Sequence, residues 1–346
     1  MKMKLDWQKL LAPSVLLLLY AFFSIFSKNF FSTQYLVNIL DSSYFIGFMA
    51  LGVTFVIITG GIDLSLGTTM ICSALIGGLM FTSGGWPMEA ALTLAVITGM
   101  TIGLLNGLMV AYLRLPPFIA TLGTQMAGLG FGAIATKVMT IRFPPFGTPE
   151  GAFKNIFYKT TNSFSLFGIR LPGFPVGALW LLIAFLMAWV LLSRTKFGRY
   201  TFAMGSNYEA ARLSGIKTKR YLTLVYTLSG FFAGMASIFY AAVYTTIIPS
   251  TGNGLELLAI AGVVIGGTSM SGGSGSLLGT MIGVFMMSVL RQGLLSMGLQ
   301  GHWQNFLTGL VLIGAVLLDQ YRVKYANRVR ISPRADHAVA AIPKKS

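Results

Sequence analysis

The residues of this chain that could do chemistry are few, and they lie in apolar surroundings. Of nine acidic residues, three lie in or beside apolar runs: Asp41, Asp63 and Glu256. Arg291 is the one strong base inside such a run. A charge at membrane depth is costly, so each of these four is a candidate functional group. Asp63 could equally cap the following helix, Glu256 could lie at the outer membrane surface, and for Arg291 we favour a snorkelled interfacial position over a bond to a polar substrate.

The sequence offers no constellation for catalysis or metal binding. General acid–base chemistry needs matched groups within hydrogen-bond reach, and the apolar runs hold no Ser/His/Asp set and no paired catalytic carboxylates. His302, His337 and the single Cys72 are too few for a metal site of nitrogen and sulfur ligands. No G-x-x-x-x-G-K-[ST] loop is present to cradle nucleotide phosphates. We therefore expect a non-enzyme without a cofactor of its own, and any ATP that drives it must be bound by another chain.

Composition indicates that lipid surrounds most of the chain. The sequence is 55% hydrophobic and 10% charged, whereas a soluble domain carries roughly a quarter charged residues. The net charge of +16 could suggest nucleic-acid binding, but no Lys or Arg occurs over 29–113, and only Arg291 over 221–321. Basic residues confined to connections and chain ends follow the positive-inside rule, so we expect no nucleic acid as a partner.

Apolar runs long enough to cross the hydrocarbon core, about 20 residues each, recur along the chain. They predict an all-α, polytopic membrane bundle, with one transmembrane domain over 1–321. The first run could be a signal peptide, but it shows no small-residue cleavage site and we interpret it as a span. The run at 64–82 is short, and the run at 254–271 is broken by glycine. The ten predicted spans are 11–28, 36–59, 64–82, 88–112, 118–140, 174–193, 219–242, 254–271, 275–297 and 303–321.

The basic residues orient these spans. If the N-terminus is cytoplasmic, the turn at Arg114, the segment 194–218 and the C-terminal tail are cytoplasmic as well. The tail, 322–346, is basic, and we expect it to be disordered. The loop 141–173 then falls on the periplasmic side although it carries four basic residues. We keep it there because moving it would break the other assignments.

Glycines form a second pattern. Many of the 41 glycines lie inside spans, where small residues let helices approach closely, and we interpret most of them as packing positions. Two Gly-Gly breaks also resemble each other, at 57–67 and 263–273, with the same orientation in the predicted topology. Internal repeats that interrupt helices often build substrate paths in transporters. Chance similarity between two Gly-rich turns is the alternative.

A short capped helix is predicted between two spans. Residues 208–213 follow Asn207 as a suitable N-cap, with Glu209 in the first turn and Gly215 closing the helix. A solid element of this kind could receive force from a partner. The alternative is an ordinary basic loop that only fixes the topology.

Four stretches, taken in order over residues 60–273, resemble one family. Ala210-Ala211 followed by Gly215-Ile216 is similar to the cytoplasmic loop of bacterial ABC-importer permeases, and the chain more specifically resembles the permeases of ribose/xylose/arabinose-type monosaccharides. The loop 141–173 and the residues after Asp319 match no part of that pattern. The stretches are Gly60-Gly61-Ile62-Asp63-Leu64-Ser65-Leu66-Gly67, Leu115-Pro116-Pro117-Phe118-Ile119-Ala120-Thr121-Leu122-Gly123, Gly205 to Ile216, and Gly266-Gly267-Thr268-Ser269-Met270-Ser271-Gly272-Gly273.

The resemblance implies an inner-membrane sugar importer. A second permease subunit (a copy or a paralogue), two ATPase domains that bind ATP and Mg²⁺, and a periplasmic sugar-binding protein would be its partners. The implied coupling loop contains Gly205, Asn207, Glu209, Ala210, Ala211, Gly215 and Ile216. The candidate translocation path contains Asp63, Ser65, Asn106, Thr121, Gln125, Asn253, Glu256, Ser269 and Arg291. These polar groups could bind sugar hydroxyls, or equally bond between helices.

Three other functions compete with this interpretation. An ion-coupled secondary transporter would need no ATPase, but scarce membrane acids and the lack of histidine in the spans argue against a proton relay. A membrane-bound transferase lacks its catalytic set. Among ABC permeases, nucleosides, autoinducer-2 and small polyols are alternative cargoes.

Overall fold

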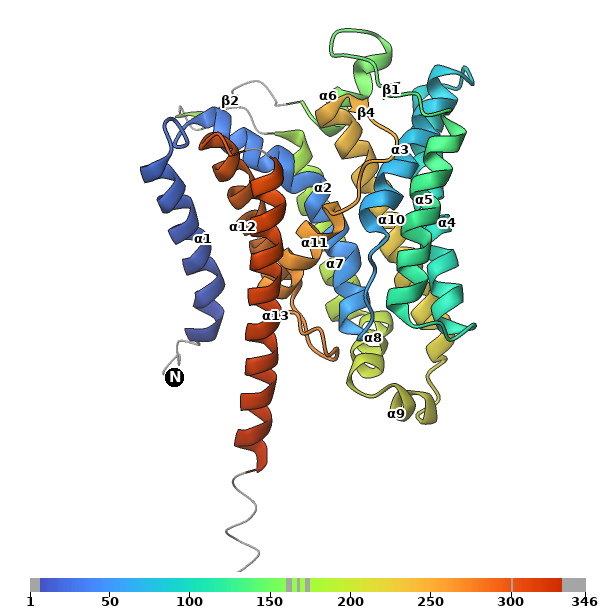
Figure 1. Ribbon diagram of the computed structural model, residues 1–346, viewed down its shortest axis with the longest axis vertical. Helices are drawn as coiled ribbons and strands as arrows, with labels where there is room; N and C mark the ends of the chain where they lie inside the picture. Colours follow the sequence, from blue (N-terminus) through green and yellow to red (C-terminus); the bar gives the residue numbers. More distant parts are fainter. Residues whose placement is uncertain (1–6, 160–163, 167–168, 172–174, 300, 332–346) are drawn as a thin grey trace, which may run out of the picture.

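The computed structural model describes residues 7–159, 164–166, 169–171, 175–299 and 301–331. The chain forms an upright bundle of helices whose two ends are built differently (Figure 1). The helices are α1 (Trp7–Phe26), α2 (Thr33–Ile58), α3 (Leu66–Thr82), α4 (Met88–Ala111), α5 (Pro117–Ala135), η1 (Glu150–Ala152), α6 (Phe153–Phe157), α7 (Val176–Arg194), α8 (Lys196–Ser206), α9 (Tyr208–Leu213), α10 (Thr218–Tyr244), α11 (Leu255–Ile265), α12 (Leu277–Ser296) and α13 (Gly301–Ile331).

Seven of the described helices are long and apolar enough to cross a membrane. Three shorter apolar helices, Ala12–Phe26, Leu66–Thr82 and Leu255–Ile265, fall where the remaining spans were predicted. The all-α, polytopic fold class is therefore confirmed, while the number of crossings and the side of each terminus stay predictions.

Two of these short helices, α3 and α11, begin inside the bundle after non-helical segments. Residues 61–65 and 248–254 contain no helix or strand and lead into α3 and α11 (Figure 1). The predicted span 254–271 is therefore not one helix, because α11 ends at Ile265. Irregular backbone at membrane depth is tolerated where protein encloses it, so these two interruptions mark places where the surrounding helices supply hydrogen bonds.

Helix α2 forms the centre of the bundle. The most apolar 18-residue window of this helix is entirely buried, against 22% for α5 and 11% for α13. Tyr44 and Phe48 contact Phe239 of α10, and Phe48 stacks on it with a centroid separation of 4.6 Å. An apolar helix enclosed on all sides is a core element, whereas α5 and α13 leave broad faces open to lipid or to another subunit.

Helices α4 and α10 cross at very short range. A Cβ on Gly99 would lie 2.5 Å from Gly230 O, and a Cβ on Gly103 would lie 2.4 Å from Tyr226 O. Only a residue without a side chain permits this approach, so the packing interpretation of these glycines is confirmed. On α5, by contrast, a Cβ on Gly123 or Gly130 would meet no described atom within 4 Å.

One end of the bundle, which we call the β1–β4 end, carries the loop 141–173. Strand β1 (Ile141–Arg142) pairs antiparallel with β4 (Thr246–Ile247), and β2 (Phe164–Leu166) pairs with β3 (Ile169–Leu171). Lys154 of α6 is only 2% exposed and donates to Thr245 Oγ1 at 2.6 Å. Burial lowers the pKa of Lys154. At least one basic residue of this loop therefore has a structural role and is not a free topological signal.

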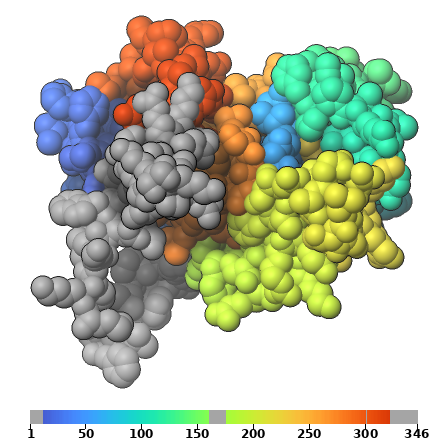
Figure 2. Space-filling view, turned by 90° about the horizontal axis from the view of Figure 1, so that it is seen from below, coloured from blue at the N-terminus to red at the C-terminus, as the bar shows by residue number. Residues whose placement is uncertain are grey.

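The opposite end, which we call the α9 end, holds α8, α9 and the first residues of α10 (Figure 1). Figure 2 views the molecule from this end, with these helices in lime to yellow. The α4–α5 turn, with Arg114, lies at the same end. Helix α13 continues to Ile331, so residues 322–331 of the tail expected to be disordered are helical, and 332–346 lie outside the described residues.

Candidate functional site

The N-termini of the two interrupted helices, α3 and α11, meet inside the bundle. A Cβ on Gly67 would lie 2.2 Å from Gly252 O and 2.5 Å from Glu256 Oε2, so α3 and the start of α11 touch through backbone. Helix N-termini present unpaired N–H groups and a partial positive charge. Asp63 precedes one of these N-termini and Glu256 lies in the first turn of the other. Each carboxylate therefore compensates the dipole of an adjacent half-helix.

Asp63 begins a chain of buried hydrogen bonds across four helices. Its Oδ1 accepts from Ser65 N at 3.0 Å and Ser65 Oγ at 2.7 Å, and its Oδ2 accepts from Ser229 Oγ at 2.9 Å. Asn106 Nδ2 donates to Ser65 Oγ at 2.9 Å, and Thr124 Oγ1 donates to Asn106 Oδ1 at 2.7 Å. Asp63 therefore both organises the start of α3 locally and binds α10, so the capping interpretation accounts for its bonds to Ser65 but not for its bond to Ser229.

Gln125 connects a second group of hydrogen-bonded polar residues, which lies beside the group around Asp63. Its Nε2 donates to Asn253 Oδ1 and to Glu256 Oε1, each at 2.9 Å. Glu256 also accepts from Gly254 N, at 3.0 and 3.1 Å to its two oxygens, and is 3% exposed. Glu256 is therefore enclosed by protein, and its depth in the membrane stays a prediction. Because Gln125 follows Thr124 on α5, this helix links the two groups, which together we call the central polar cluster.

Six predicted path residues thus come together in the central polar cluster, and three others do not join its hydrogen bonds. Thr121 is buried one turn earlier on α5, where its hydroxyl donates to Pro117 O at 2.9 Å. Ser269 lies in the 266–276 turn toward the α9 end and donates to Asp319 Oδ2 of α13 at 3.1 Å. The six are Asp63, Ser65, Asn106, Gln125, Asn253 and Glu256.

Arg291 is the third predicted path residue outside the central polar cluster, and it faces a separate cavity. Its guanidinium carbon lies 5.7 Å from the centroid of the Phe45 ring, and Nη1 is buried without a hydrogen-bond partner. Arg291 as a whole is partly exposed, and its position at the membrane surface stays a prediction. The cavity, of about 400 Å³, lies between α11, α12 and α13 and includes Asn253 in its wall.

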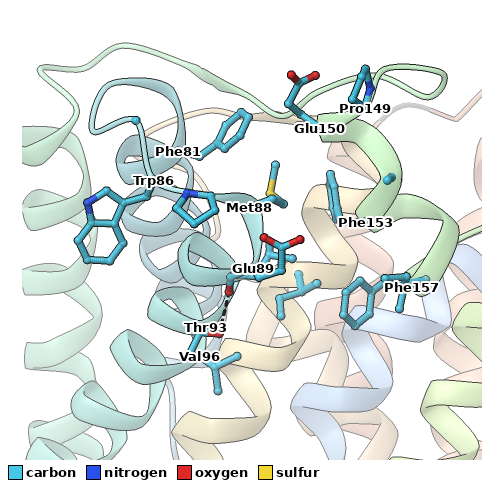
Figure 3. Close-up of a pocket in the computed structure, with 16 residues that line it drawn as sticks. Phe81, Trp86, Met88, Glu89, Thr93, Val96, Pro149, Glu150, Phe153 and Phe157 are labelled. Atoms are coloured by element: carbon cyan, nitrogen blue, oxygen red, sulfur yellow. Dashed lines mark hydrogen bonds between the residues drawn. The ribbon is translucent and has the colours of Figure 1, made fainter.

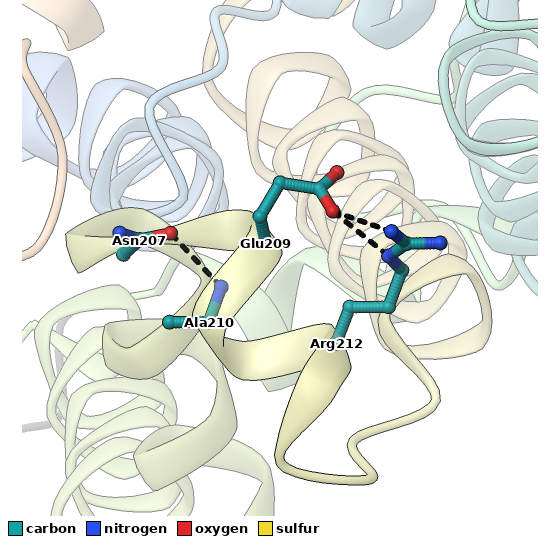
Figure 4. A network of polar contacts seen from close by, with 4 residues as sticks. All are labelled: Asn207, Glu209, Ala210 and Arg212. Carbon is teal, nitrogen blue, oxygen red and sulfur yellow. Dashed lines mark hydrogen bonds and ion pairs between the residues drawn. The ribbon is translucent and has the colours of Figure 1, made fainter.

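The hairpin of α8 and α9 carries the predicted coupling loop. Asn207 Oδ1 accepts from Ala210 N at 2.9 Å (Figure 4). Gly215 has a φ of +84° after the helix end. The predicted short helix and its N-cap are confirmed. Glu209 and Arg212 form an ion pair of 2.7 Å with both side chains more than half exposed, so we assign it little stabilisation.

The two faces of α9 differ. Ala211 is buried, and its carbonyl accepts from Ile216 N at 3.2 Å, whereas Ala210 and Gly215 are exposed. Leu213 is 81% exposed, the highest value among the large apolar side chains described. Leu213 therefore leaves an apolar side chain uncovered at the tip of the hairpin. Sequence reasoning missed it, although an apolar residue between Arg212 and a Ser-Gly turn was the available signal.

Gly205, at the end of α8, packs against both Gly-Gly breaks. The breaks lie side by side, because Gly273 N donates to Ile58 O at 2.9 Å. A Cβ on Gly205 would lie 1.8 Å from Ile58 O and 2.6 Å from Gly273 N. The two similar segments of the sequence therefore meet in space. We call their contact with Gly205, which joins the hairpin, the end of α2 and the 266–276 turn, the Gly205 junction.

A larger pocket, of about 830 Å³, opens at the β1–β4 end between the α3–α4 turn and α6 (Figure 3). Aromatic rings of Phe81, Trp86, Phe153 and Phe157 line it, with Glu89 also in its wall. These residues come from the connections at this end and from the adjoining helix ends. Within the described residues, no group of three His, Cys, Asp or Glu is placed to hold a metal.

These features define a class: a multi-pass membrane transport protein with a polar cluster between interrupted helices and a short capped hairpin at one end. Residues 35–316 match the family described as "Branched-chain amino acid transport system / permease component", and the chain belongs to that family. It is accordingly an ABC-transporter permease of the bacterial inner membrane, a multi-pass transport subunit.

Curated relatives cover most of the chain. It is 38% identical over 308 residues to the ribose import permease protein RbsC of Escherichia coli (strain K12), covering 88% of this chain and 91% of the relative. RbsC of Bacillus subtilis (strain 168) is 38% identical over 299 residues, 86% of this chain and 88% of the relative. The autoinducer 2 import system permease protein LsrC of Yersinia pseudotuberculosis serotype O:1b is 34% identical over 305 residues, 88% and 82% respectively. No solved structure matches the chain.

Proposed function

We propose that this chain is the membrane-spanning subunit through which an ABC importer moves a monosaccharide, a ribose-like pentose or a related sugar. The observation that carries the proposal is its similarity, over nearly the whole chain, to ribose import permeases from two distant bacteria. Autoinducer-2 is the second candidate cargo, because LsrC matches over the same share of the chain. The sequence contains no phosphate-binding loop, so a partner ATPase binds the ATP and Mg²⁺.

The translocation path in this proposal passes the central polar cluster. Half-helix N-termini and the irregular backbone before them form transport sites in other membrane proteins, since their free N–H and C=O groups can face a cavity. Here both N-termini are linked through side chains of α4, α5 and α10. A relative movement of these helices would exchange the internal bonds for bonds to sugar hydroxyls.

The partner ATPase docks on the α8–α9 hairpin in this proposal. The exposed Leu213 supplies an apolar contact, and the capped α9 supplies rigidity. Movement of the hairpin then reaches α2 and the 266–276 turn through the Gly205 junction. ATP binding would shift the population between two arrangements of the bundle, which is the thermodynamic content of alternating access.

The complete importer in this proposal contains two permeases, two ATPase domains and a periplasmic sugar-binding protein. The α9 end is cytoplasmic, together with both termini, because Arg114 and the basic segment 194–220 gather there. The single permease domain spans 1–321, with 141–173 on the periplasmic side.

Reconstitution tests the class of transport. Proteoliposomes containing this permease, its ATPase and its binding protein should accumulate D-ribose only when ATP is inside with the ATPase. Dissipating ion gradients with ionophores should leave uptake unchanged. Uptake by the permease alone, or uptake that collapses with the ion gradient, would establish a secondary transporter in its place.

A further inference from the structure

A polar cavity lies on the Arg291 side of the central polar cluster. Its wall is formed by the start of α11, the last part of α12 and the first turns of α13, which begins at the β1–β4 end (Figure 1). At about 400 Å³ it falls in the range of small-molecule sites. Its polar side chains are Asn253, Arg291, Gln304, Asn305 and Thr308.

Arg291 enters this cavity with unmet hydrogen-bonding capacity. Nη1 is buried without a partner, and within the described chain no carboxylate lies within 4.0 Å of the guanidinium. The ring of Phe45, with its centroid 5.7 Å away, offers a face but no acceptor lone pair. Arg291 as a whole is partly exposed, but a buried guanidinium N–H without an acceptor is costly, so Nη1 fits a ligand that supplies an oxygen acceptor.

The other polar side chains favour a neutral ligand. Gln304 and Asn305 each offer an amide that can both donate and accept, as adjacent sugar hydroxyls do. Asn253 connects the cavity wall to the Glu256 carboxylate, because Gln125 Nε2 bonds both residues at 2.9 Å. An acidic sugar would bring a second negative charge toward this carboxylate.

We propose that this cavity is a binding subsite for one neutral monosaccharide, in which the planar guanidinium of Arg291 donates to two adjacent ring hydroxyls. The amides of Gln304 and Asn305 orient the sugar. Asn253 connects the bound sugar to the hydrogen bonds of the central polar cluster. The inference rests on the proposed function and adds the place where the sugar is held and the residue that selects it.

Thiol protection in the full-length permease tests the subsite. The one native cysteine, Cys72, is buried on α3, so it contributes little background labelling. The variant L257C, whose position lies in the cavity wall and carries no bond in the proposed site, is placed in nanodiscs of zwitterionic lipid and labelled with a polar methanethiosulfonate reagent with and without D-ribose. We expect D-ribose to slow labelling, and D-glucuronate and the non-sugar solute betaine at equal osmolarity to leave it unchanged.

A second substitution assigns the effect to the guanidinium. In the R291M background D-ribose should protect L257C at least about tenfold less well, as expected for loss of hydrogen bonds from a charged donor. R291K keeps the charge without the planar fork and should give intermediate protection. Leu213→Cys, on the exposed hairpin, should label at one rate with or without sugar.

The outcomes separate this proposal from the proposed function. No protection by D-ribose, equal protection by D-glucuronate or betaine, or protection that survives R291M would each overturn the subsite. A labelling rate that responds to anionic lipid and not to sugar would assign Arg291 to lipid binding and overturn it as well. Reconstituted ATP-driven D-ribose uptake is measured in parallel, so a permease that transports without protection refutes the subsite alone.

Discussion

Replacing Gly205 with alanine probes the Gly205 junction directly. The new methyl group would lie 1.8 Å from Ile58 O and 2.6 Å from Gly273 N, whereas real Cβ contacts stay above 3.0 Å. Both obstacles are backbone, so no side-chain rotation relieves the overlap. Reaching 3.0 Å from the carbonyl requires a displacement of about 1.2 Å between α8 and the end of α2.

Two opposing energies set the expected size of the effect. Overpacking a tight contact costs typically about 1–3 kcal/mol, and more where the obstacle is rigid. Alanine regains up to about 1 kcal/mol over glycine through its higher helix propensity, an upper bound for a position at the end of α8. The steric cost therefore wins, and we expect G205A to lose about 1–2 kcal/mol of stability and to unfold at a temperature a few degrees lower.

G205A should reduce D-ribose transport more strongly than it reduces the stability of the permease. If the hairpin is displaced from α2 and the 266–276 turn, ATP hydrolysis by the partner continues while D-ribose uptake falls by about tenfold, which corresponds to a rise of about 1.4 kcal/mol in the barrier to transport. The assay measures both rates in one proteoliposome preparation, below the unfolding temperature of the variant.

Gly314→Ala is the matched control. Gly314 lies inside α13, and a Cβ there would meet no described atom within 4 Å. The only expected effect of alanine at this position is therefore its higher helix propensity. We expect unchanged or slightly raised stability and normal uptake. If G205A matches G314A in unfolding temperature and in coupling ratio, the junction does not transmit movement and our reasoning is refuted.

Three further predictions concern the hairpin and the central polar cluster. L213D should abolish co-purification of the partner ATPase without lowering the unfolding temperature, because this side chain is 81% exposed; retained binding would remove the docking assignment. G215P and E209K should abolish uptake while leaving membrane insertion intact, since proline cannot adopt the φ of +84° at Gly215 and lysine reverses the charge at the α9 N-terminus; normal uptake would contradict this. D63L should cost about 2–5 kcal/mol by leaving the Ser65 and Ser229 donors buried without an acceptor, whereas D63N, which keeps one acceptor oxygen, should cost less; equal unfolding temperatures for these two variants would show that the bonds carry little stability.

Some site features followed from local sequence and others did not. The cap of α9 was predictable because Asn207 bonds an amide three residues away. The pairing of Asp63 with Ser229 was not, since 166 residues separate them and many buried serines on other helices are chemically equivalent. The burial of Glu256 was missed for a related reason, because its partner Gln125 lies 131 residues away on α5.

The sequence by itself determined that lipid surrounds most of the chain, where the helices lie, and that a short capped hairpin joins two of them. In lipid every backbone polar group must be bonded within its own segment or enclosed by protein, so apolar runs of sufficient length specify helices without reference to their neighbours. The two Gly-Gly breaks were also visible, although nothing local said that Gly273 would bond Ile58.

Only the tertiary structure decided which groups meet. The approach of two half-helix N-termini, the contact of Gly205 with both breaks, and the cavity beside Arg291 depend on how helices distant in the chain pack together. Hydropathy is a property of each segment, whereas hydrogen bonds and close contacts between helices depend on distances of a few ångströms that are set jointly by all the packed neighbours.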